Sequence, residues 1–476
     1  MPSPLKAARR DAMLNTLASD YEGRELGVDA VDTHRSLQLG GRPADNMVND
    51  KWSIVEVLYH MWGPILRLQE ERLESVGKAE LIEHLEAYAW FRIGLGMVRP
   101  NRIDDIWDTA ALGYNRYMSR LFDRKTYYKL HKWTNVDVTE LLLGVNDAWK
   151  AGWILGGAAS ADETIVPHKG RKAGPFRQFV PRKPHNTGIK LYVVSDGVKP
   201  YVWDVFLHTG VRGVLHGPRC EGVWGHKNPL QVVQRWSDLL PARTTIICDS
   251  FFGHPLIAKW LQRERRPFLI LHRQDGVGVF HGAQGLEPGG THVTVNKATK
   301  IALHLYKHPA IGGKKTKVVP FLTNVAWDIP AEEHRSKAYI VPPIVGAYRA
   351  LSSGVDPCNQ MALQLRELGR FRTWSKAVRA FILRYAMSNT FATCQVLHLL
   401  PPNTTMFEFQ WTVMKERCHL ESPSDLCTPS PSVAHLIVCT DTALMCQGCS
   451  KGRPKTRCSA CGVHLHVKCF APYHMR

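Results

Sequence analysis

No apolar run in the sequence is long enough to cross a membrane. The longest stretches, such as residues 153–159, fall well short of the roughly 18 residues that a spanning helix needs. The first residues, MPSPLKAARRDAML, also lack the apolar core of a signal peptide. We therefore expect no membrane attachment and a reducing compartment. Disulfides are rare there, so the 12 cysteines are expected to be metal ligands or buried thiols.

Acidic residues are scarce: Asp and Glu total 42 against 61 Lys and Arg, which gives a formal net charge of +19. This excess predicts a polyanionic partner, with nucleic acid ahead of an anionic membrane surface. Hydrophobic residues make up 44% of the chain and charged residues 22%, a balance that excludes wholesale disorder. A chain of 476 residues is long enough for roughly two to four domains.

The hydrophobic period changes along the chain. Apolar residues at near-helical spacing predict helices over 53–76, 79–97, 114–130 and 374–397. Ser195-Asp196-Gly197 joins two apolar runs in the manner of a hairpin. The expected strands are the runs 160–166, 188–194, 201–207, 244–248, 268–271, 291–295, 301–306 and 317–323. A helical pattern between the fourth and fifth of these runs makes a strand–helix–strand unit, so we expect a multidomain α/β protein with a mixed sheet.

Composition shifts divide the chain into candidate domains. Residues 421–432, rich in Ser and Pro, are typical of a linker, and the cysteine-rich residues beyond it are separate. The expected parts are a poorly structured segment 1–50, a helical region 51–150, a catalytic core over 151–273 and 341–420, a β-rich inserted subdomain 274–340, a linker 421–434 and a zinc domain 435–476.

Three aspartates lie at the edges of these expected elements. Asp162 is in a strand, Asp249 follows a buried strand, and Asp356 precedes a helical stretch. Carboxylates far apart in sequence can converge when neighbouring strands carry them, and divalent cations such as Mg²⁺ or Mn²⁺ remove their repulsion. Two such ions about 3.5–4 Å apart would suit phosphodiester chemistry. The alternative is that each is a solvated turn residue. Strand alternation places Glu163 on the opposite face, so we do not include it.

A basic stretch follows the first aspartate. No acidic residue occurs from Thr164 to Ser195, and Phe176 and Phe179 interrupt the cations. Cations can neutralise phosphates and aromatic rings can support an unstacked base, which predicts a nucleic-acid groove. The alternative is a solvated basic loop. The candidate DNA-binding residues here are Lys169, Arg171, Lys172, Arg177, Arg182, Lys183 and Lys190.

The last residues of the chain carry paired cysteines at metal-ligand spacing. Each C-x2-C pair can present two thiolates to a tetrahedral zinc ion, and so short a segment needs metal to fold. The candidate ligands are Cys446, Cys449, Cys458, Cys461, His466, Cys469 and His474. Two zinc ions need one ligand more, and Cys439 is one candidate for it. His464 is expected to be a surface residue.

Several blocks of the sequence resemble successive blocks of piggyBac-type transposases. They are DETIVPHKGR, RQFVPRKPHNTGIKLYVVSD, ICDSFFG, GVDPCNQ, RFRTWSKAVRAFILRYAMSNTF and KTRCSACGVHLHVKCFAPYH, and together they cover about residues 55–476 in the right order. The resemblance implies an RNase H-like catalytic core with an inserted β-rich subdomain. It implies that Asp162, Asp249 and Asp356 are a catalytic, Mg²⁺-binding triad. It also implies cut-and-paste transposition at TTAA targets through a hairpin, homodimers that bind double-stranded DNA, and a nuclear site of action.

The same resemblance assigns further residues. It makes His435 the first choice for the eighth zinc ligand, ahead of Cys439, in a cross-braced pair of zinc sites. Trp374 matches an aromatic position that organises the DNA end, with Arg370 and Arg372 just before it; the alternative for Trp374 is a core residue at a helix start. Residues 51–150 would serve DNA binding and dimerisation.

Two departures from the family bear on activity. Asn359 stands where a fourth acidic residue is common, and LILHRQDG replaces a block rich in Gly, Thr, Arg and Asn. Three hypotheses follow: an active DNA transposase, a domesticated DNA-binding protein that no longer cuts, and an unrelated zinc-dependent reader with another α/β enzyme domain. The zinc domain has Lys and Arg but no acidic residue from Cys446 onward. This favours DNA over histone tails or ubiquitin machinery as its partner.

Overall fold

The computed structural model forms two compact units, each built from two stretches of the chain. Residues 1–48 and 149–359 make the first, which we call the sheet unit, and residues 49–148 and 360–476 make the second, the helical unit. The structure describes residues 34–35, 41–47, 52–98, 100, 102–111, 114–168, 170, 176–180, 186–208, 227–272, 285–309, 316–327, 332–333, 340–352, 354–365, 371, 373–418, 437–440, 443–449, 452–459, 461–467, 469 and 473.

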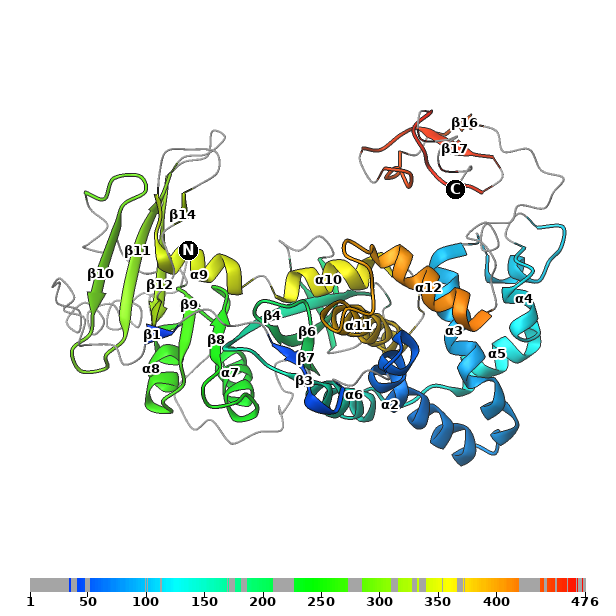
Figure 1. Cartoon of the computed structure of the whole chain (residues 1–476), viewed down its shortest axis with the longest axis horizontal. Helices are drawn as coiled ribbons and strands as arrows, with labels where there is room; N and C mark the ends of the chain where they lie inside the picture. The colour runs from blue at the N-terminus through cyan, green and yellow to red at the C-terminus, as the bar shows by residue number, and fades with distance from the viewer. Residues whose placement is uncertain are drawn as a thin grey trace. The chain divides into compact units, whose positions relative to one another are not determined.

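The sheet unit is built on a nine-stranded mixed sheet with the strand order β10-β11-β12-β9-β8-β4-β6-β5, and β7 also pairs with β6 (Figure 1). The strands are β4 (Ala158–Pro167), β5 (Arg177–Phe179), β6 (Thr187–Asp196), β7 (Val202–Leu207), β8 (Thr245–Cys248), β9 (Phe268–Leu271), β10 (Thr291–Val295), β11 (Ala302–His308) and β12 (Lys317–Thr323). Strands β4, β8 and β9 are parallel to one another. β6 pairs with β4 in antiparallel register, and β12 pairs with β9 in the same way. The order β7-β6-β4-β8-β9, three antiparallel strands followed by two parallel ones, is the expected RNase H-like core.

Helices cover both faces of this sheet. On one face α7 (Lys227–Leu239) packs beside α8 (Pro255–Arg263), and Trp236 of α7 meets Tyr192 of β6 edge to face. On the other face α9 (Pro343–Leu351) shares a buried cluster with Ala158 and Ile247, and α10 (Val355–Gln364) follows it in the chain. The sheet is therefore buried on both sides, which accounts for its nearly continuous apolar strands.

The strands expected within residues 274–340 continue the core sheet. β12 pairs with β9 in antiparallel register, so the nine strands form one sheet. Short strands complete the unit: β1 (His34–Arg35) pairs with β13 (Ala326–Trp327), β2 (Arg42–Pro43) with β3 (Trp153–Ile154), and β14 (Glu332–Glu333) with β15 (Ile340–Val341).

The buried carboxylate of Asp196 anchors the start of the described chain to the sheet. It accepts hydrogen bonds from the backbone N–H groups of Gly41 and Gly156 at 2.9 and 3.0 Å. Its other oxygen accepts from the N–H groups of Val198 and Lys199 in the turn that follows β6. The expected hairpin is thus held by a side chain as well as by its strands.

The helical unit contains α2 (Ile54–Ser75), a 3-10 helix over Ala79–His84, α3 (Leu85–Val98), a 3-10 helix over Ile103–Ile106, α4 (Met118–Leu121), α5 (Arg124–Trp133), α6 (Val138–Gly152), α11 (Trp374–Val396) and α12 (Met406–Cys418). Ser53 and Glu56 form a capping box at the start of α2. The helix expected over 114–130 is two helices, because Phe122 is extended and the Asp123 side chain caps α5 by accepting from the Thr126 N–H.

Candidate active site and metal cluster

Asp162 and Asp249 lie side by side on adjacent strands. β4 and β8 pair in parallel, and Ala161 lies opposite Cys248 in the last pair of their register. The next residue along each strand is an aspartate. Burial, followed by the negative charges of Asp249 and Asp162, raises the pKa of the Cys248 thiol, so both carboxylates lie near the same sulfur. The register thus ends one residue before both aspartates, and their convergence on a metal ion stays a prediction.

Two hydrogen bonds to β4 hold α10, which carries Asp356, and the end of α9 just before it. Thr164 Oγ1 donates to Asn359 Oδ1 at 2.8 Å, and Ser160 Oγ donates to the Ser352 carbonyl at 2.9 Å. Ser160, Asp162 and Thr164 alternate along β4 and therefore share one face. Asp356, an exposed residue in the first turn of α10, belongs to the segment that these bonds place over that face. The helix that carries Asp356 thus lies against the face of β4 that carries Asp162.

Gly354 permits this close approach. A Cβ atom at this position would lie 2.3 Å from the Asp196 carbonyl oxygen and 2.5 Å from Ser195 Oγ. Real Cβ contacts do not become that short, so any side chain would push the start of α10 away from β4 and β6. The close packing of α10 against β4 and β6 therefore requires glycine at position 354, two residues before Asp356.

The three carboxylates are spaced more widely than the ligands of a single ion. Among the described residues, the group whose ligand atoms all lie within 4.8 Å of one another is the C-terminal cysteine cluster, and the aspartates form no such group. A wider spacing suits two ions about 3.5–4 Å apart that share carboxylates. Carboxylate oxygens are the ligands that Mg²⁺ and Mn²⁺ prefer, so the donor set fits either metal.

Glu163 faces away from the three aspartates, as predicted. It lies opposite Tyr192 in the β4–β6 register, on the face covered by α7. Its carboxylate forms an ion pair with the Lys190 ammonium, with 2.9 Å between the nitrogen and the oxygen, and both side chains are less than one tenth exposed. The ammonium also lies 3.9 Å from the centre of the Phe251 ring, and the Phe251 N–H donates to Asp249 Oδ1 at 2.9 Å.

Lys190 therefore has to be removed from the predicted DNA-binding residues. Its charge is buried and paired, so it cannot reach a phosphate without leaving Glu163 unpaired. The sequence pattern missed this because β6 is buried along nearly its whole length and shows no alternation. The Glu163–Lys190–Phe251 contact behind Asp249 was missed for the same reason.

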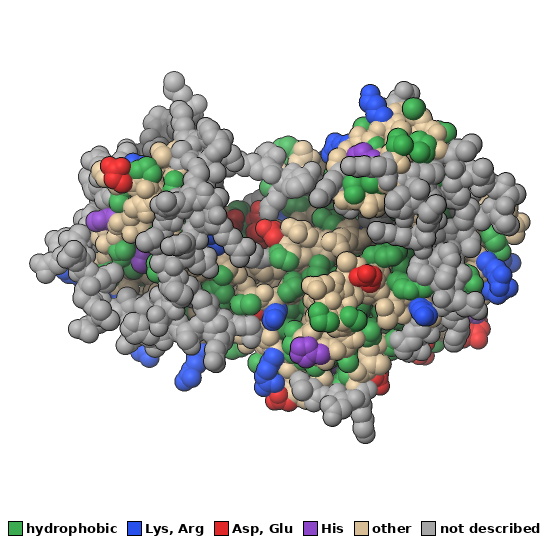
Figure 2. Space-filling view, turned by 45° about the horizontal axis from the view of Figure 1, so that its top comes forward, with side chains coloured by type: hydrophobic (Ala, Val, Ile, Leu, Met, Phe, Trp, Pro, Cys, Tyr) green, Lys and Arg blue, Asp and Glu red, His purple; other side chains and the backbone are tan. Residues whose placement is uncertain are grey.

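Of the other predicted DNA-binding cations, Arg177 is among the residues that the structure describes. It lies on β5, an edge strand, and shares its exposed face with Phe179, which is 65% exposed. An exposed cation beside an exposed ring is the pairing expected of a nucleic-acid surface. Figure 2 shows one face of the molecule, on which the Lys and Arg side chains of the described residues lie scattered rather than in one band. Lys169, Arg171, Lys172, Arg182, Lys183, Arg370 and Arg372 lie outside the described residues.

Trp374 is the first residue of α11 in the helical unit, where its side chain is partly buried. This position is consistent with the core alternative as well as with a role at the DNA end.

No helix among the described residues is long and apolar enough to cross a membrane.

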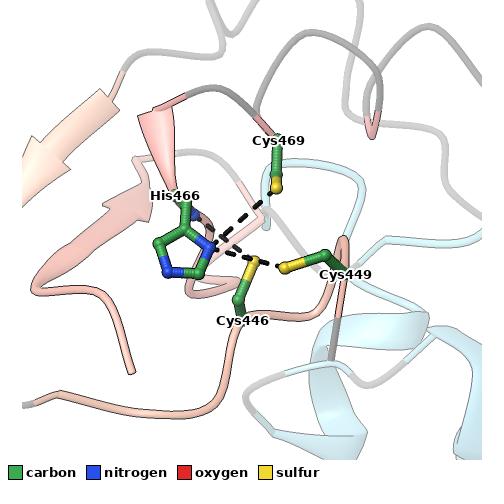
Figure 3. A group of neighbouring side chains, drawn as sticks. All are labelled: Cys446, Cys449, His466 and Cys469. Carbon is green, nitrogen blue, oxygen red and sulfur yellow. Dashed lines mark hydrogen bonds between the residues drawn. The ribbon is translucent and has the colours of Figure 1, made fainter. Parts of the chain in front are cut away.

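Four of the predicted zinc ligands come together at the C-terminus. Cys446, Cys449, His466 and Cys469 point toward one another, and their ligand atoms all lie within 4.8 Å (Figure 3). Burial works to raise the pKa of the Cys446 thiol, but backbone N–H groups, that of His466 first, donate to its sulfur and lower the pKa to about 6. A sulfur held as a thiolate by backbone donors is a good zinc ligand, so the donor set fits zinc.

Two of the other predicted ligands, Cys458 and Cys461, lie between these four in sequence. Cys458 ends β17 (Thr456–Cys458), which pairs with β16 (Ile437–Cys439), and the Cys461 N–H donates to Cys458 Sγ at 3.4 Å. The four-residue cluster does not include this C-x2-C pair, although the pair lies between its members in sequence. Such alternation of ligands is expected of a cross-braced fold. Cys439 is exposed on β16, whereas His435 and His474 lie outside the described residues.

The expectation for His464 is wrong. This residue is only 6% exposed, and its ring nitrogen Nδ1 lies 3.4 Å from the Pro454 carbonyl oxygen. It packs inside the module and supports the strands that carry Cys458.

Comparisons with known proteins agree with the fold. A family model described as Transposase IS4 matches residues 69–391, which is more than half of the chain. The chain therefore belongs to the IS4/piggyBac-type transposase family. Its structure is similar to a cryo-EM structure titled "piggyBac transposase synaptic complex with hairpin DNA", with a TM-score of 0.62 and 16% sequence identity over 90% of this chain and 100% of that chain. Membership of this family implies a divalent metal ion at the active site.

Proposed function

We propose that the protein is a metal-dependent transposase that cuts DNA at the ends of its element and joins those ends to TTAA targets. The observation that carries this proposal is the parallel register that sets Asp162 beside Asp249, with α10 and Asp356 held over the same face of β4. Together these residues supply carboxylates at the edge of an RNase H-like sheet. Family membership supports the same conclusion.

The aspartates would hold Mg²⁺ or Mn²⁺, which, when bound, lowers the pKa of an attacking water or hydroxyl and stabilises the leaving oxygen. The protein's own part is positioning. The strand pairing fixes Asp162 and Asp249, the Phe251 N–H orients the Asp249 carboxylate, and the bonds to Ser160 and Thr164 fix the helix that carries Asp356. Rigid placement of this kind lowers the barrier by removing reorganisation from the reaction.

The reaction would run in steps at phosphorus. Water attacks a phosphodiester at the end of the element, the bond to the 3′-oxygen breaks, and a free 3′-hydroxyl remains. That hydroxyl attacks a phosphodiester of the opposite strand, which closes a hairpin on the excised element and releases the flanking DNA with a free 3′-hydroxyl. After the hairpin is reopened, the same hydroxyl attacks a target phosphodiester at TTAA and releases a target 3′-hydroxyl.

The remaining parts of the chain would bind DNA. Arg177, Phe179 and the basic segment around them would contact the DNA backbone, and the C-terminal zinc module, holding two Zn²⁺ ions, would bind the end of the element. We also propose that the protein acts as a homodimer and in the nucleus, where its substrate is. Sedimentation with and without end DNA and imaging of a tagged full-length chain test these two points.

Cleavage tests the triad directly. The substrate is a duplex that carries the inverted repeats flanking the gene, bounded by TTAA, and the products are separated on denaturing gels. We expect Mg²⁺-dependent nicks and hairpins from the native protein and a rate at least about 100-fold lower from Asp249→Asn. Asp238→Asn, an exposed residue of α7, is the matched control. Equal cleavage by the two variants would overturn the proposal.

One observation favours a second candidate, a DNA-binding protein that no longer cuts. The oxygen of Asn359, which stands where the family commonly has an acid, accepts the Thr164 hydroxyl. It adds no charge to the site. End-specific binding without cleavage in either Mg²⁺ or Mn²⁺ would establish this alternative.

A further inference from the structure

A pocket in the helical unit has a positively charged lining. Arg92 of α3, His131 of α5 and both Lys376 and Arg379 of α11 line it, together with the side chains of Gln69 and Thr134. Four separate segments of the chain meet here, so the charges are brought together by the fold and not by their order in the sequence. The pocket contributes nothing to the triad or to the cysteine cluster.

The two cations that α11 contributes to this pocket, Lys376 and Arg379, hydrogen-bond to neutral acceptors. Arg379 is 7% exposed, and its Nη1 donates to the Val136 carbonyl at 2.7 Å. Lys376 Nζ lies 3.4 Å from the His131 carbonyl, and the Arg92 guanidinium lies 5.8 Å from the centre of the Tyr88 ring. In the part of the chain that the structure describes, no carboxylate forms an ion pair with Lys376 or Arg379. Neutral acceptors satisfy their hydrogen bonds, and the Asp137 carboxylate compensates part of the Arg379 charge.

Each cation makes the others less favourable. Burial, then the Arg379 and Arg92 guanidinium groups, lowers the pKa of Lys376. Burial and Arg92 lower the pKa of Arg379 to about 10 against the opposing effect of Tyr88 and Asp137, so this guanidinium remains charged at neutral pH. Burial lowers the pKa of His131 to about 4, which leaves that ring neutral at neutral pH. Like charges gathered in one pocket destabilise it when it is empty, and an anion would remove this repulsion.

We propose that this pocket binds a phosphate group, held between Lys376, Arg379 and Arg92. Guanidinium groups present forks of N–H donors that match the oxygens of a phosphate, and the ammonium adds a point charge. The phosphate can come from a DNA backbone or from inorganic phosphate in solution. The DNA source rests on the proposed function, and the free source does not.

Two measurements on the full chain test the pocket. The first is thermal unfolding in sodium phosphate against sodium chloride at equal ionic strength. We expect phosphate to raise the native midpoint by about 2–4 °C and to have no such effect on Lys376→Met. Lys376→Met should also unfold no earlier than the native protein in chloride, because it removes repulsion. Lys129→Met, an exposed lysine of α5 outside the pocket, is the control and should respond to phosphate as the native protein does. Lys376→Gln replaces Lys376→Met if the latter fails to fold.

The second measurement is the salt dependence of DNA binding. If the phosphate belongs to DNA, Lys376→Met reduces the slope of log K against log salt by about 0.9, and Lys129→Met does not. A lost thermal response with an unchanged slope assigns the pocket to free phosphate. The proposal is overturned if Lys376→Met matches Lys129→Met in both measurements. A protein that binds no DNA at low salt refutes the proposed function, and the thermal measurement still decides on the pocket.

Discussion

Asn359 on α10 accepts a hydrogen bond from the Thr164 hydroxyl on β4, with 2.8 Å between the two oxygens. The bond ties the helix that carries Asp356 to the strand that carries Asp162. Asparagine here therefore has a structural role, because it fixes α10 against β4. It does so without the charge that a carboxylate would add.

Restoring that charge should strengthen the metal site. A carboxylate at this position keeps the acceptor for Thr164 and adds a negative charge beside the divalent ions. We expect Asn359→Asp to lower the Mg²⁺ concentration for half-maximal cleavage by about tenfold, the effect of roughly 1.4 kcal/mol. Gln360→Glu, an exposed neighbour on α10, changes the net charge equally. Equal metal dependence in both variants would show that position 359 is not part of the site.

The glycine at the start of α10 gives a separate test of positioning. A Cβ at Gly354 would lie 2.3 Å from the Asp196 carbonyl oxygen, so Gly354→Ala must shift the helix and Asp356 with it. A misplacement of about 1 Å can lower a rate by about 100-fold. We expect that loss in cleavage with DNA binding retained. Gly346→Ala on α9, where a Cβ meets nothing within 4 Å, should leave cleavage unchanged.

The buried pair behind Asp249 should matter for folding. Removing one partner leaves the other charged and buried, so Lys190→Met is expected to cost about 3–5 kcal/mol in the free energy of unfolding, measured with urea. The double variant Lys190→Met/Glu163→Gln should recover most of that loss. Arg263→Met breaks the exposed Arg263–Glu264 pair and should cost under about 1 kcal/mol. A Lys190→Met protein as stable as this control would refute the pairing.

The core strands and helices could be predicted because each follows a local pattern. The strand expected over 160–166 is β4, and the helix expected over 374–397 is α11. Local patterns do not give strand order, however. The parallel pairing of β4 with β8 joins segments far apart in the chain, so the adjacency of Asp162 and Asp249 had to be inferred from family resemblance.

The prediction of side-chain direction was wrong in β6, because a strand buried on both faces shows no alternation of apolar and polar residues. Lys190 was read as a DNA contact because it lies in a basic stretch, yet β6 buries both faces and pairs the lysine with Glu163. The charged pocket was missed for a related reason: Arg92 and Arg379 are far apart in sequence and meet through helix packing. By contrast the C-x2-C spacing, which depends only on local geometry, predicted the ligands that the structure brings together.

The zinc module makes a prediction about stoichiometry. Native mass spectrometry of the full chain should find two zinc ions, and Cys446→Ser and Cys458→Ser should each remove one, because they belong to different sites. A second pair of variants identifies the eighth zinc ligand. We expect His435→Asn to lower zinc occupancy and Cys439→Ser to leave it unchanged. Cys394→Ser, a buried thiol of α11, is the control. Loss of both ions from Cys446→Ser alone would show one shared site instead of two.

His208 should make the sheet unit sensitive to acid. Its ring lies 3.3 Å from the Tyr192 hydroxyl, and burial, with help from the Lys190 charge, lowers its pKa to about 4 against 6.5 for an unfolded histidine. Between these values the unfolded chain binds a proton that the folded chain does not, so stability falls as pH falls from about 6.5 to 4 and is fully present above that window. Other histidines whose pKa is lowered by burial, such as His304, add to the loss from pH 7 to pH 5, so we expect urea unfolding to show a loss that is smaller by about 1–2 kcal/mol in His208→Gln than in the native protein. His398→Asn, an exposed position with a positive φ that asparagine adopts readily, should keep the native pH response. An unchanged response in His208→Gln would mean that other groups cause the acid sensitivity.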